Sequence, residues 1–344
     1  MTTVKGAAIR STSMSGRIGA CALAFLLLAA CRPYADFALP RSAASSAAEV
    51  GFTAQPDAGL TPGAPGEWDS SDVLNPSVVS HGNQYWNFYS GFDGKVWSTG
   101  LAVSPDGIRW SKQGKVLSPD PGTWEGDYIA ANGSAIWRNN EFLYWYQAGK
   151  RGEFRIGLAR SSDGRNWRKE PTPVLERGPY RSWDEFDVAD PYVLELDGLL
   201  YMYYLGQDRA ARQQIGVARS SDGVHWEKLR SNPVLEVPQP GSGSFAEHGL
   251  GEPAVFQWNQ RYWMLYTGRD TNEYRRIGAA WSDDGVHWHP QSQPFSGTAV
   301  WDNKVICDPT VLNENGMVRV WFGGGNVASP DERLHGSIGA AVLQ

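Results

Sequence analysis

Residues 183–206 read WDEFDVADPYVLELDGLLYMYYLG, and a version of this stretch occurs five times along the chain. Each version begins with an aromatic residue and has a polar or acidic residue seven positions later in four of the five copies, usually followed by proline. It ends in an aromatic-rich run that stops at glycine. The aromatic residues that begin the copies lie 56, 59, 62 and 56 residues apart and are Trp68, Trp124, Trp183, Phe245 and Trp301. A period of this length indicates a repeated supersecondary unit.

Each copy has the pattern of several antiparallel strands. A short apolar run and an aromatic-rich run are joined by a Gly- or Asn-containing turn, which is a hairpin signal. A third run follows, such as RIGLARS at 155–161, and in four copies it leads into a turn of the form Ser-x-Asp-Gly-x-x-Trp. Four antiparallel strands make a propeller blade. The sequence therefore predicts an all-β fold, a five-bladed β-propeller of four-stranded antiparallel blades, over residues 67–344.

The fifth copy stops at Gln344, before any outer strand. A ring of five blades would then need its last strand from elsewhere in the chain. We expect residues 49–55 to supply it, because closing the ring removes exposed strand edges.

The N-terminus has the pattern of a targeting segment. Basic residues come first, and an apolar run from Ile18 to Ala30 then leads to Cys31. This run is too short to span a bilayer comfortably. Residues 28–31, Leu-Ala-Ala-Cys, resemble the bacterial lipobox, in which the cysteine carries lipid; an ordinary secretory signal is the alternative. We expect a lipoprotein signal peptide at 1–30, lipidation of Cys31, and a location at the outer membrane, periplasm or cell surface of a bacterium.

Composition bears on the segment before the folded domain, on nucleic-acid binding and on disulfides. Residues 31–66 are rich in Ala, Ser, Pro and Gly, which predicts a flexible tether between the lipid and the folded domain. The net charge of −6 argues against binding to nucleic acid, which needs a basic surface. Cys307 would be the one cysteine left besides the lipidated one, so no intramolecular disulfide is expected, and a lone buried thiol usually fills a core.

The polar position that follows each aromatic residue, here called the slot, is the candidate site. The first strands of propeller blades line the central channel, so slot side chains are expected to converge there. Three carboxylates in one cavity raise at least one pKa, which suggests chemistry. The alternative is that Asp-Pro and Glu-Pro only cap the starts of strands. The five slots hold Asn75, either Ala131 or Asn132, Asp190, Glu252 and Asp308.

Paired carboxylates, one protonated and one ionised, are what the hydrolysis of a glycosidic bond requires. The repeat and its acidic slots resemble the five-bladed propeller superfamily of glycoside hydrolases: arabinanases and xylosidases of family 43, invertases of family 32, and mannoside phosphorylases. By this resemblance Glu252, in Gly-Glu-Pro, is the general acid, and Asp190, in Ala-Asp-Pro, is the aspartate that modulates it. The run Asn132-Gly133-Ser134-Ala135 is similar to a substrate-binding turn of family 32. The implied partner is an oligo- or polysaccharide.

The first blade departs from the family pattern. Its slot is Asn75, where families 32 and 43 have a catalytic Asp, and an amide is neither base nor nucleophile. We expect Asp308 to replace it, and next Asp72, which lies three residues before Asn75. The other candidates for contact with substrate are Asp127 and Asp187, which match Asp72 in the next two blades, and His248.

The departure at Asn75 leaves three functions open. The first is a glycoside hydrolase, the second a non-catalytic glycan-binding propeller, and the third a phosphorylase, in which phosphate attacks in place of activated water. No cofactor or metal is expected from ligand spacing, although some relatives hold a structural cation in the channel. Arginines in loops or at strand starts could hold phosphate, the alternative being surface charges; they are Arg151, Arg155, Arg209, Arg212, Arg269, Arg275 and Arg276.

Overall fold

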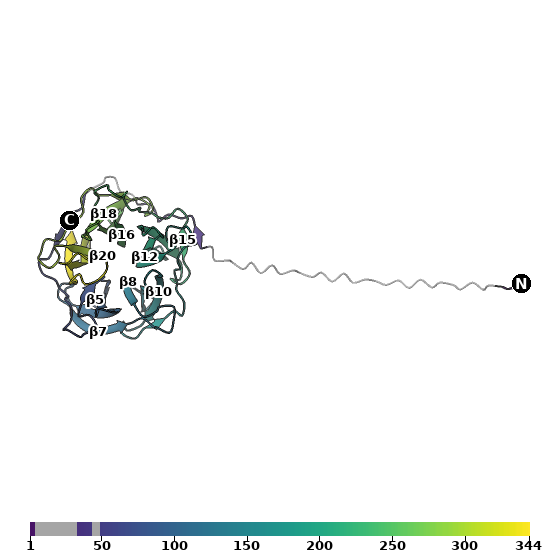
Figure 1. Ribbon diagram of the computed structural model, residues 1–344, viewed down its shortest axis with the longest axis horizontal. Helices are drawn as coiled ribbons and strands as arrows, with labels where there is room; N and C mark the ends of the chain where they lie inside the picture. Colours follow the sequence, from purple (N-terminus) through teal and green to yellow (C-terminus); the bar gives the residue numbers. More distant parts are fainter. Residues whose placement is uncertain (4–32, 43–48) are drawn as a thin grey trace. The chain divides into compact units, whose positions relative to one another are not determined.

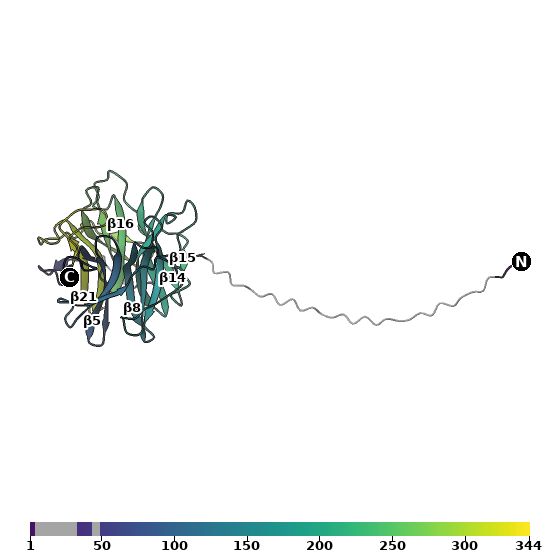
Figure 2. The same ribbon diagram turned by 60° about the horizontal axis from the view of Figure 1, so that its bottom comes forward.

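A computed structural model describes residues 1–3, 33–42 and 49–344 of the chain. The unit from Arg32 to Gln344 consists of strands and turns in its described parts and has no helix there. Five groups of strands are arranged around a central axis, with β8, β12, β16 and β20 innermost in their blades (Figure 1). Figure 2 shows strands of neighbouring blades standing side by side around this axis. The predicted all-β five-bladed propeller is confirmed.

Blades one and two each run from the channel outward by antiparallel pairing. In blade one the innermost position is split into two short strands. Its strands are β3 (Asp72–Leu74), β4 (Val78–His81), β5 (Gln84–Phe92), β6 (Trp97–Ser104) and β7 (Ser111–Leu117). Those of blade two are β8 (Ile129–Arg138), β9 (Glu141–Gly149), β10 (Arg155–Ser161) and β11 (Arg168–Lys169).

Blades three to five repeat this order. The strands of blade three are β12 (Asp187–Leu196), β13 (Leu199–Gln207), β14 (Gln213–Ser220) and β15 (Glu227–Leu229). Those of blade four are β16 (Gly249–Trp258), β17 (Arg261–Arg269), β18 (Arg275–Ser282) and β19 (His289–Pro290). Blade five contains β20 (Val305–Glu314), β21 (Met317–Gly325) and β22 (Ser337–Leu343).

The outer strand of blade five comes from the N-terminal part of the chain. Strand β2 (Phe52–Ala54) pairs antiparallel with β22, with Phe52 opposite Leu343. Phe52 also stacks on Phe295 and meets the edge of Phe322. The expectation that residues 49–55 complete the ring is therefore confirmed.

The predicted tether at 31–66 is wrong for the residues that the structure describes there. Strand β1 (Tyr34–Ala35) pairs in parallel with β15, and Leu39 is only 2% exposed. Leu60 is 3% exposed and bridges to Ile338. Apolar side chains and edge hydrogen bonds hold these segments to the propeller, which their Ala-, Ser- and Pro-rich composition concealed.

The expected signal peptide and the lipidated Cys31 lie outside the described residues, apart from residues 1–3. Within the described part of the chain, no helix is long and apolar enough to cross a membrane.

The Ser-x-Asp-Gly turns have the structural role that their unchanged repetition predicts. In the first copy Asp106 Oδ1 accepts bonds from the backbone N–H groups of Ile108 (2.8 Å) and Arg109 (3.0 Å). Gly107 takes a φ of 72°, which favours glycine. Its carbonyl also accepts a bond from Trp321 Nε1 of blade five at 2.5 Å. These turns thereby connect adjacent blades.

A second repeated feature is a buried cluster of tyrosine, acid and lysine in blades one to three. In blade three, Lys228 Nζ lies 2.5 Å from Asp184 Oδ2, and Tyr204 Oη donates to the same oxygen at 3.2 Å. Burying a charge is costly unless it is paired, and here each carboxylate has both a cation and a hydroxyl. The matching clusters are Tyr89, Asp69 and Lys112 in blade one, and Tyr146, Glu125 and Lys169 in blade two.

We predict that Phe52→Ala destabilises the propeller by about 2 kcal/mol, because it removes an aromatic side chain that holds the closing strand. Urea unfolding followed by tryptophan fluorescence measures the effect. Thr53→Ala, an exposed change in the same strand, is the control and should stay within about 0.5 kcal/mol. Equal stabilities of the two variants would show that β2 does not close the ring.

Candidate functional site

All five slots share one unusual backbone conformation. Each slot residue has a positive φ, which non-glycine residues rarely adopt and which often marks functional sites. In blades two to five the slot lies where the register between the inner strand and its neighbour shifts, as between Gly251 and Ala254. The slot residues and their φ values are Asn75 (47°), Asn132 (48°), Asp190 (47°), Glu252 (52°) and Asp308 (53°). The second slot is thus Asn132 and not Ala131.

The slot residues form the floor of a cavity of about 310 Å³. Its wall comes from the ends of the second strands and from loops between strands, and includes Tyr128, Phe154 and Phe186. A second, much smaller cavity of about 30 Å³ adjoins the slots. It is lined by slot residues and by the residues that follow the slots, such as Pro191 and Pro253. A ligand would therefore enter from the wide side and stop at the ring of slot side chains.

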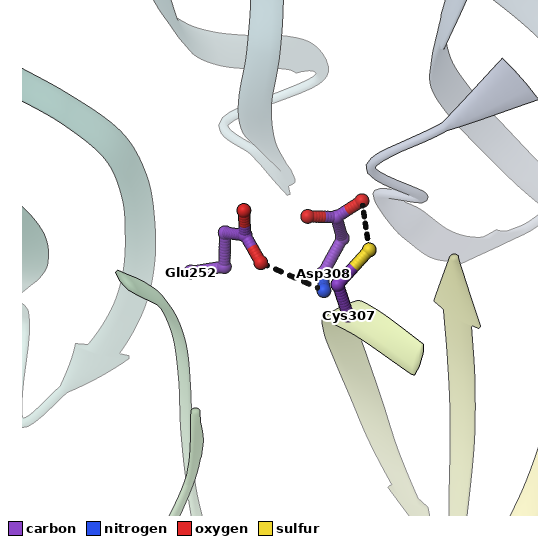
Figure 3. Close-up of side chains that lie close together, drawn as sticks. All are labelled: Glu252, Cys307 and Asp308. Carbon is purple, nitrogen blue, oxygen red and sulfur yellow. Dashed lines mark hydrogen bonds between the residues drawn. The ribbon is translucent and has the colours of Figure 1, made fainter. Parts of the chain in front are cut away.

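Hydrogen bonds connect three adjacent slots. The backbone N–H of Asp308 donates to Glu252 Oε2 at 3.1 Å, and the backbone N–H of Asn75 donates to Asp308 Oδ2 at 3.1 Å. Figure 3 shows Glu252 and Asp308 facing each other, with the Cys307 thiol donating to Asp308 Oδ2 at 3.1 Å. The nearest oxygens of the two carboxylates lie within 4.8 Å of each other. The structure thus brings Glu252 together with Asp308, as the sequence predicted.

Asp190 lies on the other side of Glu252, in the neighbouring blade. Its Oδ1 accepts a bond from Asn132 Nδ2 at 3.3 Å. Burial, and then the negative charge of Glu252, raise the pKa of Asp190 to about 8. This carboxyl group therefore keeps its proton at neutral pH, as the convergence of acidic slots predicts.

Asp308 is the most buried of the three carboxylates, only 5% exposed. Burial and the charge of Glu252 raise its pKa well above the usual value. The pKa of the adjacent Cys307 thiol is raised as well, by burial and by the charges of Asp308 and Glu252. Both groups therefore hold protons, and neither is poised as a base or nucleophile.

Glu252, Cys307 and Asp308 are also the one set of three potential metal ligands that lie together in the described part of the chain. A metal ion would have to displace the protons of the thiol and of Asp308. The buried guanidinium of Arg275, whose surroundings include all three groups, already supplies positive charge there. The possible channel cation stays a prediction.

Three of the seven arginines named above reach the cavity: Arg151, Arg269 and Arg275. All three contact one loop, residues 326–336 between β21 and β22. Glu332 of this loop pairs with Arg151, Asp331 lies 3.9 Å from Arg269, and the carbonyl of Pro330 accepts a bond from Arg275. The other four pair with acids elsewhere: Arg155 with Glu176, Arg209 with Glu185, Arg212 with Asp208 and Arg276 with Asp270.

Asp187 and Asp72 have different places in the structure. Asp187 lines the cavity; its pKa is raised to about 6 by burial, and it accepts a bond from the backbone N–H of Phe154 at 2.6 Å. Asp72 is fully buried away from the cavity. Its two oxygens accept bonds from the backbone N–H groups of Arg333 (2.6 Å) and Gly336 (2.8 Å), so it holds the loop 326–336. The structure does not bring Asp72 to the site.

The remaining predicted residues also lie away from the cavity. Asp127 is exposed, and His248 pairs with Glu273 at 3.2 Å. Ser134 Oγ accepts a bond from the backbone N–H of Val193 at 3.0 Å and so connects blades two and three. Its equivalent Ser77 binds Ala135 of the next blade in the same way, which gives this position a structural role.

Sequence reasoning missed a second ring of residues above the slots. Ser90, Gln147 and Thr267 precede the glycines that end the aromatic strands, and each contacts a slot residue: Ser90 and Gln147 bind Asn132, and Thr267 binds Asp308. The available signal was a polar residue at the end of an otherwise aromatic strand, in a position that varies between copies.

We predict that Asp190 makes stability depend on pH. A carboxyl group whose pKa is raised by folding stabilises the folded state fully below its unfolded pKa near 4, and this contribution is lost as the pH rises towards 8. Between pH 5 and 8 the free energy of unfolding should fall less steeply in Asp190→Asn than in the wild type, by up to about 1.4 kcal/mol per pH unit. Urea unfolding at several pH values measures this. Asp127→Asn is the matched exposed control, and identical slopes in all three proteins would contradict the prediction.

Comparison with known proteins places the fold among carbohydrate-active propellers. The family model "Glycosyl hydrolases family 32 N-terminal domain" matches residues 77–238. An uncharacterized protein of Mycobacterium tuberculosis is 27% identical over 231 residues, which cover 62% of this chain and 75% of that protein. A 1,2-beta-oligomannan phosphorylase of a Thermoanaerobacter strain is 29% identical over 225 residues, 62% of this chain and 68% of the phosphorylase.

Solved structures agree on the fold. A thermostable family-43 glycoside hydrolase aligns with a TM-score of 0.59 at 19% identity, over 79% of this chain and 88% of the hydrolase. The family model, the relatives and this structure together confirm the resemblance drawn from the acidic slots. The chain is therefore similar, in its fold and in residues 77–238, to the five-bladed β-propellers among which glycoside hydrolases of families 32 and 43 are found.

Proposed function

We propose that this chain cleaves glycosidic bonds, with Glu252 as the proton donor and Asp190 as the residue that keeps a proton available to it. The observation that supports this most directly is the carboxylate pair at the floor of the cavity. Glu252 is partly exposed to the cavity, and the pKa of Asp190 beside it is raised to about 8. Protonation of the leaving oxygen by a carboxylic acid is the shared first requirement of glycoside cleavage.

In this proposal Asp190 supplies the proton that Glu252 passes to the substrate. Interacting carboxyl groups lose their protons in steps that belong to the pair, not to either residue. In this proposal Asp190 holds the proton in the resting state because desolvation and the charge of Glu252 raise its pKa, and among the described residues its carboxylate accepts a bond from the Asn132 amide. When the glycosidic oxygen approaches Glu252, a proton of the pair passes to that oxygen as its bond to carbon breaks.

The group that attacks the sugar distinguishes two versions of the proposal. In a hydrolase a carboxylate activates water, and Asp308, with an oxygen within 4.8 Å of one of Glu252, would first have to lose its proton to do so. In a phosphorylase, phosphate attacks directly and needs no base. The second version is favoured by the amide at Asn75, by the proton on Asp308, and by the three arginines at the cavity. Hydrolysis is the simpler expectation for this superfamily, and phosphorolysis is the second candidate.

We predict that Glu252→Gln lowers turnover by a factor of about 10² to 10⁴, because an amide cannot donate the required proton. The substrates to test are β-1,2-mannobiose, sucrose 6-phosphate and aryl xylosides and arabinosides, which correspond to the named activities of the relatives. Glu141→Gln, the same change in a residue that pairs with Arg160 away from the channel, is the control.

The same assay with and without inorganic phosphate separates the versions. Turnover that requires phosphate and releases a sugar phosphate identifies a phosphorylase, and turnover in its absence identifies a hydrolase. Retained activity in Glu252→Gln would reject the assigned acid. Binding of these glycans without turnover by the wild-type protein would support the third function, a non-catalytic glycan-binding propeller.

We also propose that the mature protein is attached to a bacterial membrane through lipid on Cys31 and acts outside the cytoplasm on oligo- or polysaccharides. Small residues before a lone cysteine, at the end of an apolar run, support this. We predict that Cys31→Ser moves the protein expressed in a Gram-negative host from the membrane fraction to the soluble fraction. An unchanged membrane fraction would contradict lipidation at this residue.

A further inference from the structure

Blade four lacks the buried tyrosine, acid and lysine cluster that fills the same place in blades one to three. The acid after the aromatic residue is replaced by Ala246, which follows Phe245 as Asp184 follows Trp183. The lysine is replaced by Pro290, which lies opposite Ala280 as Lys228 lies opposite Ala218. Two of the three members of the cluster are therefore absent from this blade.

The tyrosine of the cluster is retained without its partner. Tyr266 lies opposite Gly278 as Tyr204 lies opposite Gly216, so it is the equivalent residue. In blades one to three this hydroxyl donates to the acid, whereas Tyr266 Oη has no hydrogen-bond partner among the described residues. The loss of the acid and the lysine thus leaves a polar group behind.

A cavity of about 730 Å³ occupies this place, here called the blade-four cavity. Its volume lies in the range of roughly 300–1,000 Å³ that small-molecule sites occupy. Phe245 and Tyr266, stacked at 6.1 Å, form an aromatic wall. The polar wall includes Ser244, Glu247, Asp270, Gln291 and Ser292, with the exposed Glu236 also among the lining residues. Gln291 Oε1 is buried and has no partner in the described part of the chain.

The charges of the cavity exclude an anionic ligand. Three lining residues are acidic, and the single lining arginine, Arg276, is paired with Asp270 at 3.1 Å. The three acids are not gathered into a metal site, because the one set of three clustered metal-ligand residues in the described chain is Glu252, Cys307 and Asp308. What remains is a set of hydrogen-bond acceptors beside aromatic rings.

We propose that the blade-four cavity is a second carbohydrate-binding site, which takes a neutral sugar unit of a glycan. Sugar hydroxyls are donors that suit carboxylate and amide oxygens, and the C–H face of a sugar ring packs on aromatic side chains. Leu250 lies in the walls of both cavities, so a glycan held here is close to the cavity above the slots, here called the funnel. This inference does not depend on catalysis in the funnel.

The test uses affinity electrophoresis of the full mature protein, with the Glu252→Gln change to prevent turnover. The probes are gels that contain mannan, levan, arabinan or xylan, which are neutral, and polygalacturonate, which is anionic. We expect retardation by at least one neutral glycan and none by polygalacturonate. Ala246→Asp with Pro290→Lys, which rebuilds the cluster of blade three, should weaken this binding at least tenfold.

Gln291→Ala tests the same site without filling it and should weaken binding several-fold; Gln113→Ala, an exposed residue of blade one, is the matched control. If the double variant does not unfold cooperatively, Gln291→Ala decides the outcome. The proposal is overturned if no neutral glycan retards the protein, or if the cavity variants bind as tightly as the control. Because the funnel variant is common to all proteins compared, failure here is distinct from failure of the proposed catalysis.

Discussion

A left-handed backbone conformation, repeated at five points around one axis, determines where every candidate catalytic group lies. A positive φ costs a non-glycine residue about 1–3 kcal/mol, and it persists only where the surroundings enforce it. Here the surroundings are hydrogen bonds between blades: the backbone N–H of Asp308 is held by Glu252, and that of Asn75 by Asp308. The same hydrogen bonds therefore hold the backbone of the slots in place and bring their carboxyl groups together.

The charge of this ring follows from its burial. Burial and the charge of Glu252 raise the pKa of both Asp190 and Asp308, so the three carboxyl groups are not ionised together and protons remain on these two aspartates. A fold alone has little use for such an arrangement. Cleavage of a glycosidic bond has a direct use for it, since the leaving oxygen needs a proton at neutral pH.

The fold could be predicted from the sequence because the pattern of one blade occurs five times along the chain. The spacing of Trp68, Trp183 and Trp301 predicted the number of blades. The fifth copy lacks an outer strand, which predicted that residues 49–55 complete the ring. The tether could not be predicted correctly, because composition does not show that Leu39 and Leu60 are buried.

The site was predictable to the level of the slots and no further. Asp190, Glu252 and Asp308 repeat at one position, and that position converges on the axis. Asp72 repeats almost as regularly, yet its oxygens bind the backbone of a loop that the sequence does not place beside it. The loss of the cluster in blade four was visible as Ala246 and Pro290, but its meaning required the cavity that results.

The most direct test of this account is infrared difference spectroscopy of the carboxyl groups at pH 7, comparing the wild-type protein with Asp190→Asn. We predict a carbonyl band of a protonated carboxylic acid in the wild type that is absent from the variant and that disappears as the pH is raised past about 8. If the two spectra at pH 7 differ only by the loss of an ionised carboxylate band, Asp190 holds no proton, and the shared acid at the centre of the proposed mechanism does not exist.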